Sequence, residues 1–202
     1  MIPPFDITLV QSILVAVFAY LLGAVPFGIV SAKLFGLGNL RQIGSGNIGA
    51  TNVLRTGNKP AAFLTLVGDI GKGAAAVLLA RYLLGDTAAQ IAAFAAFLGH
   101  CFPIFLGFKG GKGVATFLGT VLALSFPIGV ACCLTWLASA AVIRISSASA
   151  LLASASGVIW AQIFERPEMS LLLILLAGLI WWRHQENIKR LMRGSEPKIG
   201  KK

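Results

Sequence analysis

The stretch that decides the fold is residues 114–143, VATFLGTVLALSFPIGVACCLTWLASAAVI, which contains no charged residue. As one α-helix it would be about 45 Å long, whereas the hydrocarbon core of a bilayer is about 30 Å thick. Ser125, Pro127 and Gly129 offer a break near its middle, because proline and glycine interrupt helices. The stretch therefore forms either one overlong helix or two short membrane spans.

The composition places the whole chain in a membrane. Of its 202 residues, 57% are apolar and only 12% are charged, and the mean hydropathy is +0.85. A soluble domain carries about a quarter of charged residues, so a water-soluble globule is excluded. We expect a single membrane domain over residues 1–202. The three cysteines have neither disulfide nor zinc-site spacing.

Five further apolar runs predict spans of their own. Four have about the 20 residues that cross a bilayer, and the fifth is shorter but ends in an interfacial Trp-Trp-Arg anchor. These predicted spans are 7–30, 60–84, 87–108, 145–164 and 168–183. The first six residues carry no Lys or Arg, so we expect the first span to be retained rather than cleaved as a signal peptide.

The basic residues decide how often the central stretch crosses. A single crossing would export a C-terminal tail that carries six Lys and Arg residues, which the positive-inside rule disfavours. Two crossings, as 114–126 and 128–143, leave every basic residue except Lys72, Arg81 and Arg166 at the cytoplasmic side. We therefore predict an all-α polytopic membrane protein with seven transmembrane helices, the N-terminus periplasmic and the C-terminus cytoplasmic. These loops also explain the net charge of +10 without a nucleic-acid partner.

The first polar segment on the cytoplasmic side is residues 44–57, GSGNIGATNVLRTG. Its glycines, Gly44 and Gly46 among them, would let successive N–H groups face one concavity, as in an anion-binding nest. Arg55 offers a planar fork that suits phosphate. Short polar side chains add further donors, from Ser45, Asn47, Thr51 and Asn52. A flexible connector is the alternative interpretation.

The second polar segment, residues 107–116, reads GFKGGKGVAT. It looks like a P-loop, but Gly113 follows Lys112 where a P-loop needs Ser or Thr to hold magnesium. A nucleotide–magnesium site is therefore disfavoured, while backbone amides with Lys109 and Lys112 would suit a phosphate monoester. The alternative is that both lysines anchor the helix end to lipid phosphates, which fits Lys109 better than Lys112.

The remaining polar candidates lie in or near apolar runs. His184 opens the third polar segment, with Asn187 on the same helical face, and a histidine there suits acid–base or hydrogen-bonding work. An interfacial polar residue is the alternative. His100 is interpreted as a packed core residue. Asp69 and Lys72 stand three apart inside a span, where an unpaired charge costs about 2.5–3.5 kcal/mol, so we expect them to neutralise each other.

An apolar membrane domain could accept an acyl chain, and its cytoplasmic loops could accept phosphate. Together they favour an enzyme that assembles lipid head groups. No Ser-His-Asp or Cys-His nucleophile set is evident and carboxylates are few, so we expect neither a cofactor nor a metal. Such an enzyme would work by positioning and charge stabilisation on an activated substrate. The rival class is an anion transporter, which usually binds between repeats at the midplane. The tripeptide GKG occurs twice, at 71–73 and 111–113. One copy lies within a predicted span and the other in a loop, so we predict no internal structural repeat.

Three strings carry a resemblance to a known family. They are GSGNIGATNVLR at 44–55, GHCFPIFLGFKGGKGVAT at 99–116 and HQENIKRLMRGSE at 184–196, with DIGKG at 69–73 and the pair Arg144 and Ser147 in support. They resemble the signature motifs of the bacterial acyl-phosphate:glycerol-3-phosphate acyltransferases, the PlsY family. That resemblance implies transfer of a fatty acyl group from acyl phosphate to the 1-hydroxyl of sn-glycerol 3-phosphate. The products would be lysophosphatidic acid and inorganic phosphate, in phospholipid biosynthesis.

The resemblance also implies roles for residues. The catalytic group would be Ser45, Arg55, His184 and Asn187. Substrate would be bound by Gly44, Gly46, Asn47, Thr51, Asn52, Lys109, Gly110, Gly111, Lys112, Gly113 and Ser147. Structural support would come from Asp69, Lys72 and either Glu186 or Glu196.

The resemblance finally implies where the protein works and with what. We expect a multi-pass protein of the bacterial inner membrane whose active site faces the cytoplasm. Its partners would be the lipid bilayer, the two substrates and an upstream enzyme that produces acyl phosphate. Because an acyl phosphate is already activated, we expect direct attack by the glycerol hydroxyl, with the departing phosphate taking the proton.

Overall fold

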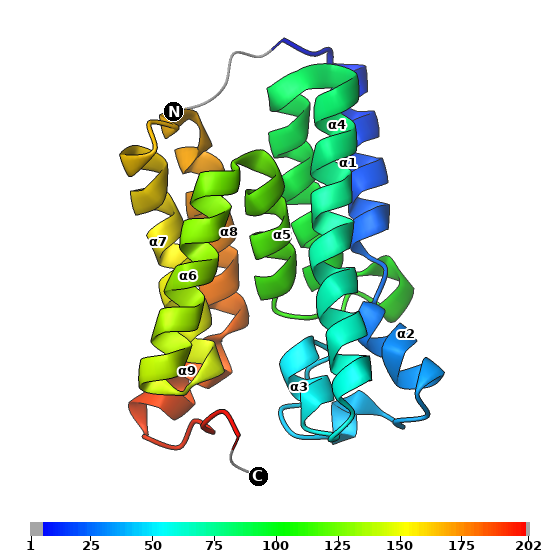
Figure 1. The fold of residues 1–202 in the computed structure, drawn as a ribbon. Helices are drawn as coiled ribbons and strands as arrows, with labels where there is room; N and C mark the ends of the chain where they lie inside the picture. The colour runs from blue at the N-terminus through cyan, green and yellow to red at the C-terminus, as the bar shows by residue number, and fades with distance from the viewer. Residues whose placement is uncertain (1–5, 201–202) are drawn as a thin grey trace.

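Helices account for nearly all of the regular structure in the computed structural model, which describes residues 6–200. Figure 1 shows them standing roughly side by side in a bundle. They are α1 (Leu9–Gly23), α2 (Phe27–Leu34), α3 (Ala50–Leu54), α4 (Lys59–Cys101), α5 (Val114–Leu124), α6 (Phe126–Ile143), α7 (Ser146–Ile163), α8 (Ser170–Arg183) and α9 (Gln185–Met192). Short 3-10 turns lie at Leu40–Gln42, Ile104–Leu106 and Pro167–Met169. The all-α prediction is confirmed for the described residues.

The charge-free central stretch forms two helices, α5 and α6, which meet at a single extended residue. Ser125 has φ −150° and ψ 107°, and Pro127 lies in the first turn of α6, where its missing N–H costs nothing. A Cβ on Gly129 would collide with the backbone of Leu122, so the glycine lets α6 return closely against α5. The predicted break is therefore present, with bounds shifted by about two residues.

The long helix α4 contains the second predicted break. Gly85 has φ 86° and ψ −169°, a conformation that glycine adopts readily, and the chain reverses there into two arms that lie side by side in Figure 1. The first arm agrees with the predicted span 60–84. The second ends at Cys101, not at residue 108 as predicted, because Pro103 has no N–H to continue the helix.

The first predicted span, 7–30, is also interrupted. α1 ends at Gly23 and α2 begins at Phe27, because Pro26 stands between them. Within residues 6–200, three helical segments are long and apolar enough to cross a bilayer, namely Leu9–Leu34, Lys59–Leu106 and Phe126–Ile143. Seven crossings and their orientation stay predictions.

Small residues let the helices approach closely. Gly23 of α1 and Gly99 of α4 face each other, since a Cβ on Gly23 would strike the backbone of Ala96 and one on Gly99 the backbone of Tyr20. Alanines fill the rest of this contact, at positions 19, 76, 80, 88, 92, 95 and 96. Close backbone approach of this kind drives helix association where lipid is as apolar as the side chains.

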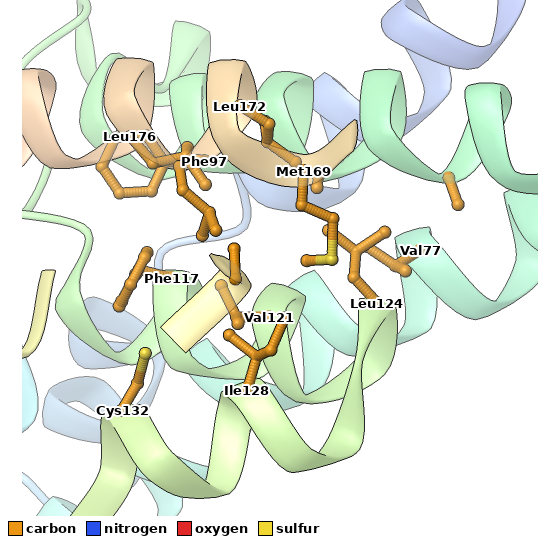
Figure 2. Close-up of a cluster of buried hydrophobic side chains, with 14 of the residues drawn as sticks. Val77, Phe97, Phe117, Val121, Leu124, Ile128, Cys132, Met169, Leu172 and Leu176 are labelled. Atoms are coloured by element: carbon orange, nitrogen blue, oxygen red, sulfur yellow. The ribbon is translucent and has the colours of Figure 1, made fainter. Parts of the chain in front are cut away.

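A second cluster of buried side chains joins α4 and α5 to α6 and α8. Figure 2 shows Phe97, Phe117 and Leu176 on one side of it and Val77 and Leu124 on the other. Phe97, Phe117 and Leu176 are fully buried. This core holds the C-terminal helices against the N-terminal ones, and the cavity described below opens beyond it.

Arg81 is one of the basic residues that the predicted topology leaves on the outer side, and its contacts give it a structural role. Its guanidinium donates to the carbonyl oxygens of Ala123 (2.6 Å) and Leu124 (2.8 Å) and to the Asp86 carboxylate (2.8 Å). These carbonyls belong to the last turn of α5, which has no helical partners for them. Arg81 therefore caps a helix of only 11 residues.

We predict that Gly99→Ala destabilises the bundle by about 1–3 kcal/mol, as overpacking does, because the new methyl group would press against the α1 backbone. Thermal unfolding in detergent measures the change. Gly71→Ala is the matched control on the same helix, since its Cβ would meet open space. An equal loss of stability in both variants would contradict the close α1–α4 approach.

Candidate active site

A cavity of about 680 Å³ lies where the three polar segments meet. In Figure 1 the elements that surround it, α3, the start of α4, the end of α6 and α9, gather at one end of the bundle. Its lining combines a polar end with apolar walls. The apolar walls are formed by Phe63, Leu66, Ile70, Leu118, Trp136 and Leu137, with others.

Most of the predicted site residues line this cavity. Those that do are Ser45, Asn47, Thr51, Asn52, Arg55, Asp69, Lys112, Gly113, Ser147, His184, Asn187 and Glu196. The predicted residues outside its lining are Gly44, Gly46, Lys72, Lys109, Gly110, Gly111 and Glu186. Residues far apart in the sequence are thus brought to one place.

Asn52 organises the first polar segment from within. Its side-chain amide donates to the carbonyls of Leu40 (3.0 Å) and Asn47 (2.7 Å). Its Oδ1 accepts from the backbone N–H of Ser45 at 3.0 Å and lies 3.3 Å from the Ser45 hydroxyl. Because Asn52 is 2% exposed and its amide is bonded within the loop, it shapes the segment that presents Ser45.

Three N–H groups of this segment are already bonded within the protein and are not free for an anion. The N–H of Ser45 is bonded to Asn52, that of Gly46 to Ile43 and that of Ile48 to the Asn47 side chain. Gly44 is needed for another reason, since it has φ 53° and packs against Asn52 and Arg55. At Ser45 the segment therefore offers a ligand its side-chain rather than its backbone donor.

Two backbone N–H groups of the second segment are also bonded within the protein. The N–H groups of Gly110 and Gly111 donate to the carbonyls of Cys101 and His100, each at 3.1 Å. Lys109 is exposed, and its carbonyl accepts from Arg41 at 2.6 Å. The donors that face the cavity come later, at Lys112 and at the start of α5, which begins after Gly113 without a side-chain cap and so presents unpaired N–H groups and a positive dipole.

Lys112 is the cation at the centre of the polar end. Its ammonium donates to Oδ1 of Asn187, which joins the second segment to the third. Burial lowers the pKa of Lys112 to about 8, although the nearby Glu196 carboxylate opposes that shift. The side chain is therefore mostly charged at neutral pH and loses its charge within the accessible alkaline range.

His184 is held as a neutral ring. It is 3% exposed, and burial lowers its pKa to about 4, with its contact to the Ile180 carbonyl opposing and the Lys112 charge adding to the shift. The Nδ1 atom lies 2.7 Å from that carbonyl, so in the neutral ring Nδ1 carries the proton and donates. The other nitrogen, Nε2, is then an acceptor for a hydroxyl group in the cavity.

Glu196 joins the C-terminal tail to the rest of the site. Its carboxylate accepts from Ser147 (2.7 Å), Asn187 (2.5 Å) and Arg190 (2.6 Å). Burial acts to raise its pKa, but these hydrogen bonds outweigh it and hold the pKa below the usual range. Glu186 instead pairs with Lys189 on the surface. Of the two glutamates left open by the sequence, Glu196 thus makes the contacts of a structural residue.

Two residues missed by the sequence analysis clamp the second segment. Arg183 donates to the carbonyls of Gly111 (3.1 Å) and Gly110 (3.0 Å) and lies over the Phe102 ring. Arg183 was interpreted as part of an interfacial anchor. Arg41, which bonds the Lys109 carbonyl, carried no signal beyond its charge.

We predict that Glu196→Gln lowers the free energy of unfolding by about 1.5–3 kcal/mol, the range for hydrogen bonds to a charged group. The stabilisation is present above the ordinary glutamate pKa and is lost as the pH falls through the depressed pKa of the folded state. Thermal unfolding from pH 7 down to about pH 2, a range that extends below the ordinary glutamate pKa, measures both effects. Glu186→Gln is the control, expected to change nothing measurable; an equal effect in both would contradict the assignment.

Comparison with known proteins gives a consistent result. The family model for glycerol-3-phosphate acyltransferase matches residues 13–194. A curated glycerol-3-phosphate acyltransferase from Cereibacter sphaeroides is 62% identical over 200 residues, which cover 99% of this chain and 95% of that protein. Another from Jannaschia sp. is 63% identical over 201 residues, which cover 100% of this chain and 99% of that protein.

Solved structures agree with the sequence comparison. A crystal structure of PlsY, an integral membrane glycerol 3-phosphate acyltransferase in its glycerol 3-phosphate form, matches with a TM-score of 0.89 and 39% identity, over 94% of this chain and 96% of that one. Its lysophosphatidic acid form matches with a TM-score of 0.85 and 37% identity, over 94% and 95%.

Proposed function

The chain belongs to the glycerol-3-phosphate acyltransferase family, and we propose that it transfers a fatty acyl group from acyl phosphate to the 1-hydroxyl of sn-glycerol 3-phosphate. The observation that carries the proposal is the cavity, whose cationic, hydrogen-bonding end adjoins apolar walls. A phosphate-bearing acceptor suits the first part and an acyl chain the second. The products are lysophosphatidic acid and inorganic phosphate.

Two cations and a helix end suit the phosphate groups. Lys112 is a point charge, Arg55 can bond two oxygens at once, and the unpaired N–H groups at the start of α5 favour an anion. All three border the same cavity. Ser45 and Asn187 add polar contacts, so that the phosphate of the acceptor and that of the donor both have partners.

Acyl transfer needs no covalent intermediate on the protein. The 1-hydroxyl oxygen attacks the carbonyl carbon of the acyl phosphate, an ester bond forms, and the bond from that carbon to the phosphate oxygen breaks. The hydroxyl proton passes to the departing phosphate. Nε2 of His184 accepts a hydrogen bond from the attacking hydroxyl and orients it, while Arg55 and Lys112 stabilise the charge on the leaving group.

Seven crossings with the N-terminus outside place this cavity at the cytoplasmic face of a bacterial inner membrane. The distribution of Lys and Arg supports this topology. The acceptor is water-soluble, whereas the donor and the product are lipids, and a site at this boundary serves both. An upstream enzyme that makes acyl phosphate would deliver it to the same face.

An acyl-transfer assay on purified protein tests the donor. Acyl phosphate and acyl-CoA are offered side by side with glycerol 3-phosphate, and we expect transfer from acyl phosphate with release of inorganic phosphate. Lys112→Ala should lose this activity. Transfer from acyl-CoA alone would overturn the donor assignment, and phosphate uptake into liposomes without acyl transfer would favour a transporter.

The depressed pKa of Lys112, about 8, predicts an alkaline limit. As the pH rises through 8 the ammonium loses its proton and its attraction for phosphate, so KM for glycerol 3-phosphate should rise by about tenfold per pH unit above that point if the charged form alone binds. The measurement is KM from pH 6.5 to 9.5. Lys112→Arg stays charged and should show a flat profile; a rise of KM in both proteins would exclude Lys112 as its source.

A further inference from the structure

A row of buried polar groups leads from the α1–α2 break to the second polar segment. The Lys72 ammonium donates to the Val25 carbonyl at 2.8 Å and lies 2.8 Å from the Asp69 carboxylate. The same carboxylate oxygen lies 3.4 Å from Nδ1 of His100. All three side chains are at most 5% exposed, so the His100 ring is packed inside the protein with the Asp69 carboxylate beside it.

The other edge of the His100 ring rests on Gly111. A Cβ added to Gly111 would meet three ring atoms, Nε2, Cε1 and Cδ2, as its nearest neighbours. Gly111 does not have a positive φ, so an alanine there is compatible with the backbone. The space beside Gly111 is therefore taken by the ring of His100.

Three contacts hold this glycine in place. Its N–H donates to the His100 carbonyl at 3.1 Å and its carbonyl accepts from Arg183 at 3.1 Å, while the His100 ring covers its Cα. Lys112 is the next residue, and its position along the cavity depends on where Gly111 lies. Arg183 and the backbone hold the segment through hydrogen bonds, and the His100 ring packs against Gly111 as the Phe97 ring does against Gly113.

We propose that His100, held by Asp69, is a positioning residue that sets the depth of Lys112 in the cavity and so the affinity for the phosphate of the acceptor. The proposal rests on the proposed function. His100 itself lines the cavity but need not touch substrate, because it acts through Gly111. Its loss should move Lys112 and raise KM for glycerol 3-phosphate more than it lowers kcat.

A double-mutant cycle tests the idea. Gly111→Ala adds a methyl group where the ring lies, and we expect KM to rise by about 10- to 100-fold, since misplacement of about 1 Å has effects of that order. His100→Ala should raise KM by about tenfold. The double variant His100→Ala/Gly111→Ala should be no worse than His100→Ala, because the methyl group then occupies the space of the absent ring. Coupled residues show such non-additivity.

Gly110 supplies the matched control. A Cβ there would meet the backbone carbonyls of His100 and Cys101, which remain when the ring is removed. His100→Ala should therefore not rescue Gly110→Ala. If His100→Ala folds poorly, His100→Asn takes its place, since a shorter polar side chain stays beside Asp69 while leaving Gly111 uncovered.

The readouts are KM and kcat of purified variants, with the thermal shift produced by glycerol 3-phosphate as a measure of binding. Rescue of Gly111→Ala alone supports the proposal. The proposal would be overturned if the effects of His100→Ala and Gly111→Ala on KM simply added. It would also be overturned if His100→Ala rescued Gly110→Ala equally well, or if His100→Ala left KM unchanged. A wild-type protein that transfers no acyl group would instead refute the proposed function, so the two failures are distinguishable.

Discussion

A hydrocarbon environment offers no hydrogen-bond partners, so each interruption of a helix in this chain needs a protein group to satisfy the freed backbone. Buried or half-buried Lys and Arg side chains donate hydrogen bonds to the freed backbone carbonyls. Lys72 bonds the Val25 carbonyl where α1 gives way to α2, and Arg81 bonds the last carbonyls of α5. Arg183 bonds Gly110 and Gly111 after α4 ends. The architecture of broken helices depends on these contacts between cations and carbonyls.

The same breaks create the site. Because α4 stops at Cys101 and α5 starts only at Val114, a stretch of non-helical backbone can turn Lys112 toward the cavity. Irregular backbone at this depth is tolerated only where it lines a cavity or is buried in protein. The side-chain bonds Lys112–Asn187 and Ser147–Glu196 then join the polar segments to one another.

The sequence predicted the helices well and the roles of its glycines poorly. The break at Ser125 and the reversal at Gly85 were accessible because proline, glycine and hydropathy act locally. The N–H groups of Ser45 and Gly46 find partners inside their own loop, which composition does not reveal, and the anion-binding nest stays a prediction. Glu186 and Glu196 could not be separated either, since only the folded tail brings Glu196 to Ser147. His100 was correctly expected to be packed, but its contact with Gly111 depends on tertiary structure.

The bond between Ser147 and Glu196 also has a meaning for biogenesis. Ser147 lies at the start of α7 and Glu196 follows α9, so the two meet only when α7 and α8 form a hairpin that returns the chain to the same face. In the proposed topology, a nascent chain whose α8 fails to cross leaves Glu196 on the opposite side of the membrane together with Asn187 and Arg190, and Ser147 loses its partner. Correct insertion of the α7–α8 hairpin is, in that topology, a condition for the contact between Ser147 and the C-terminal tail.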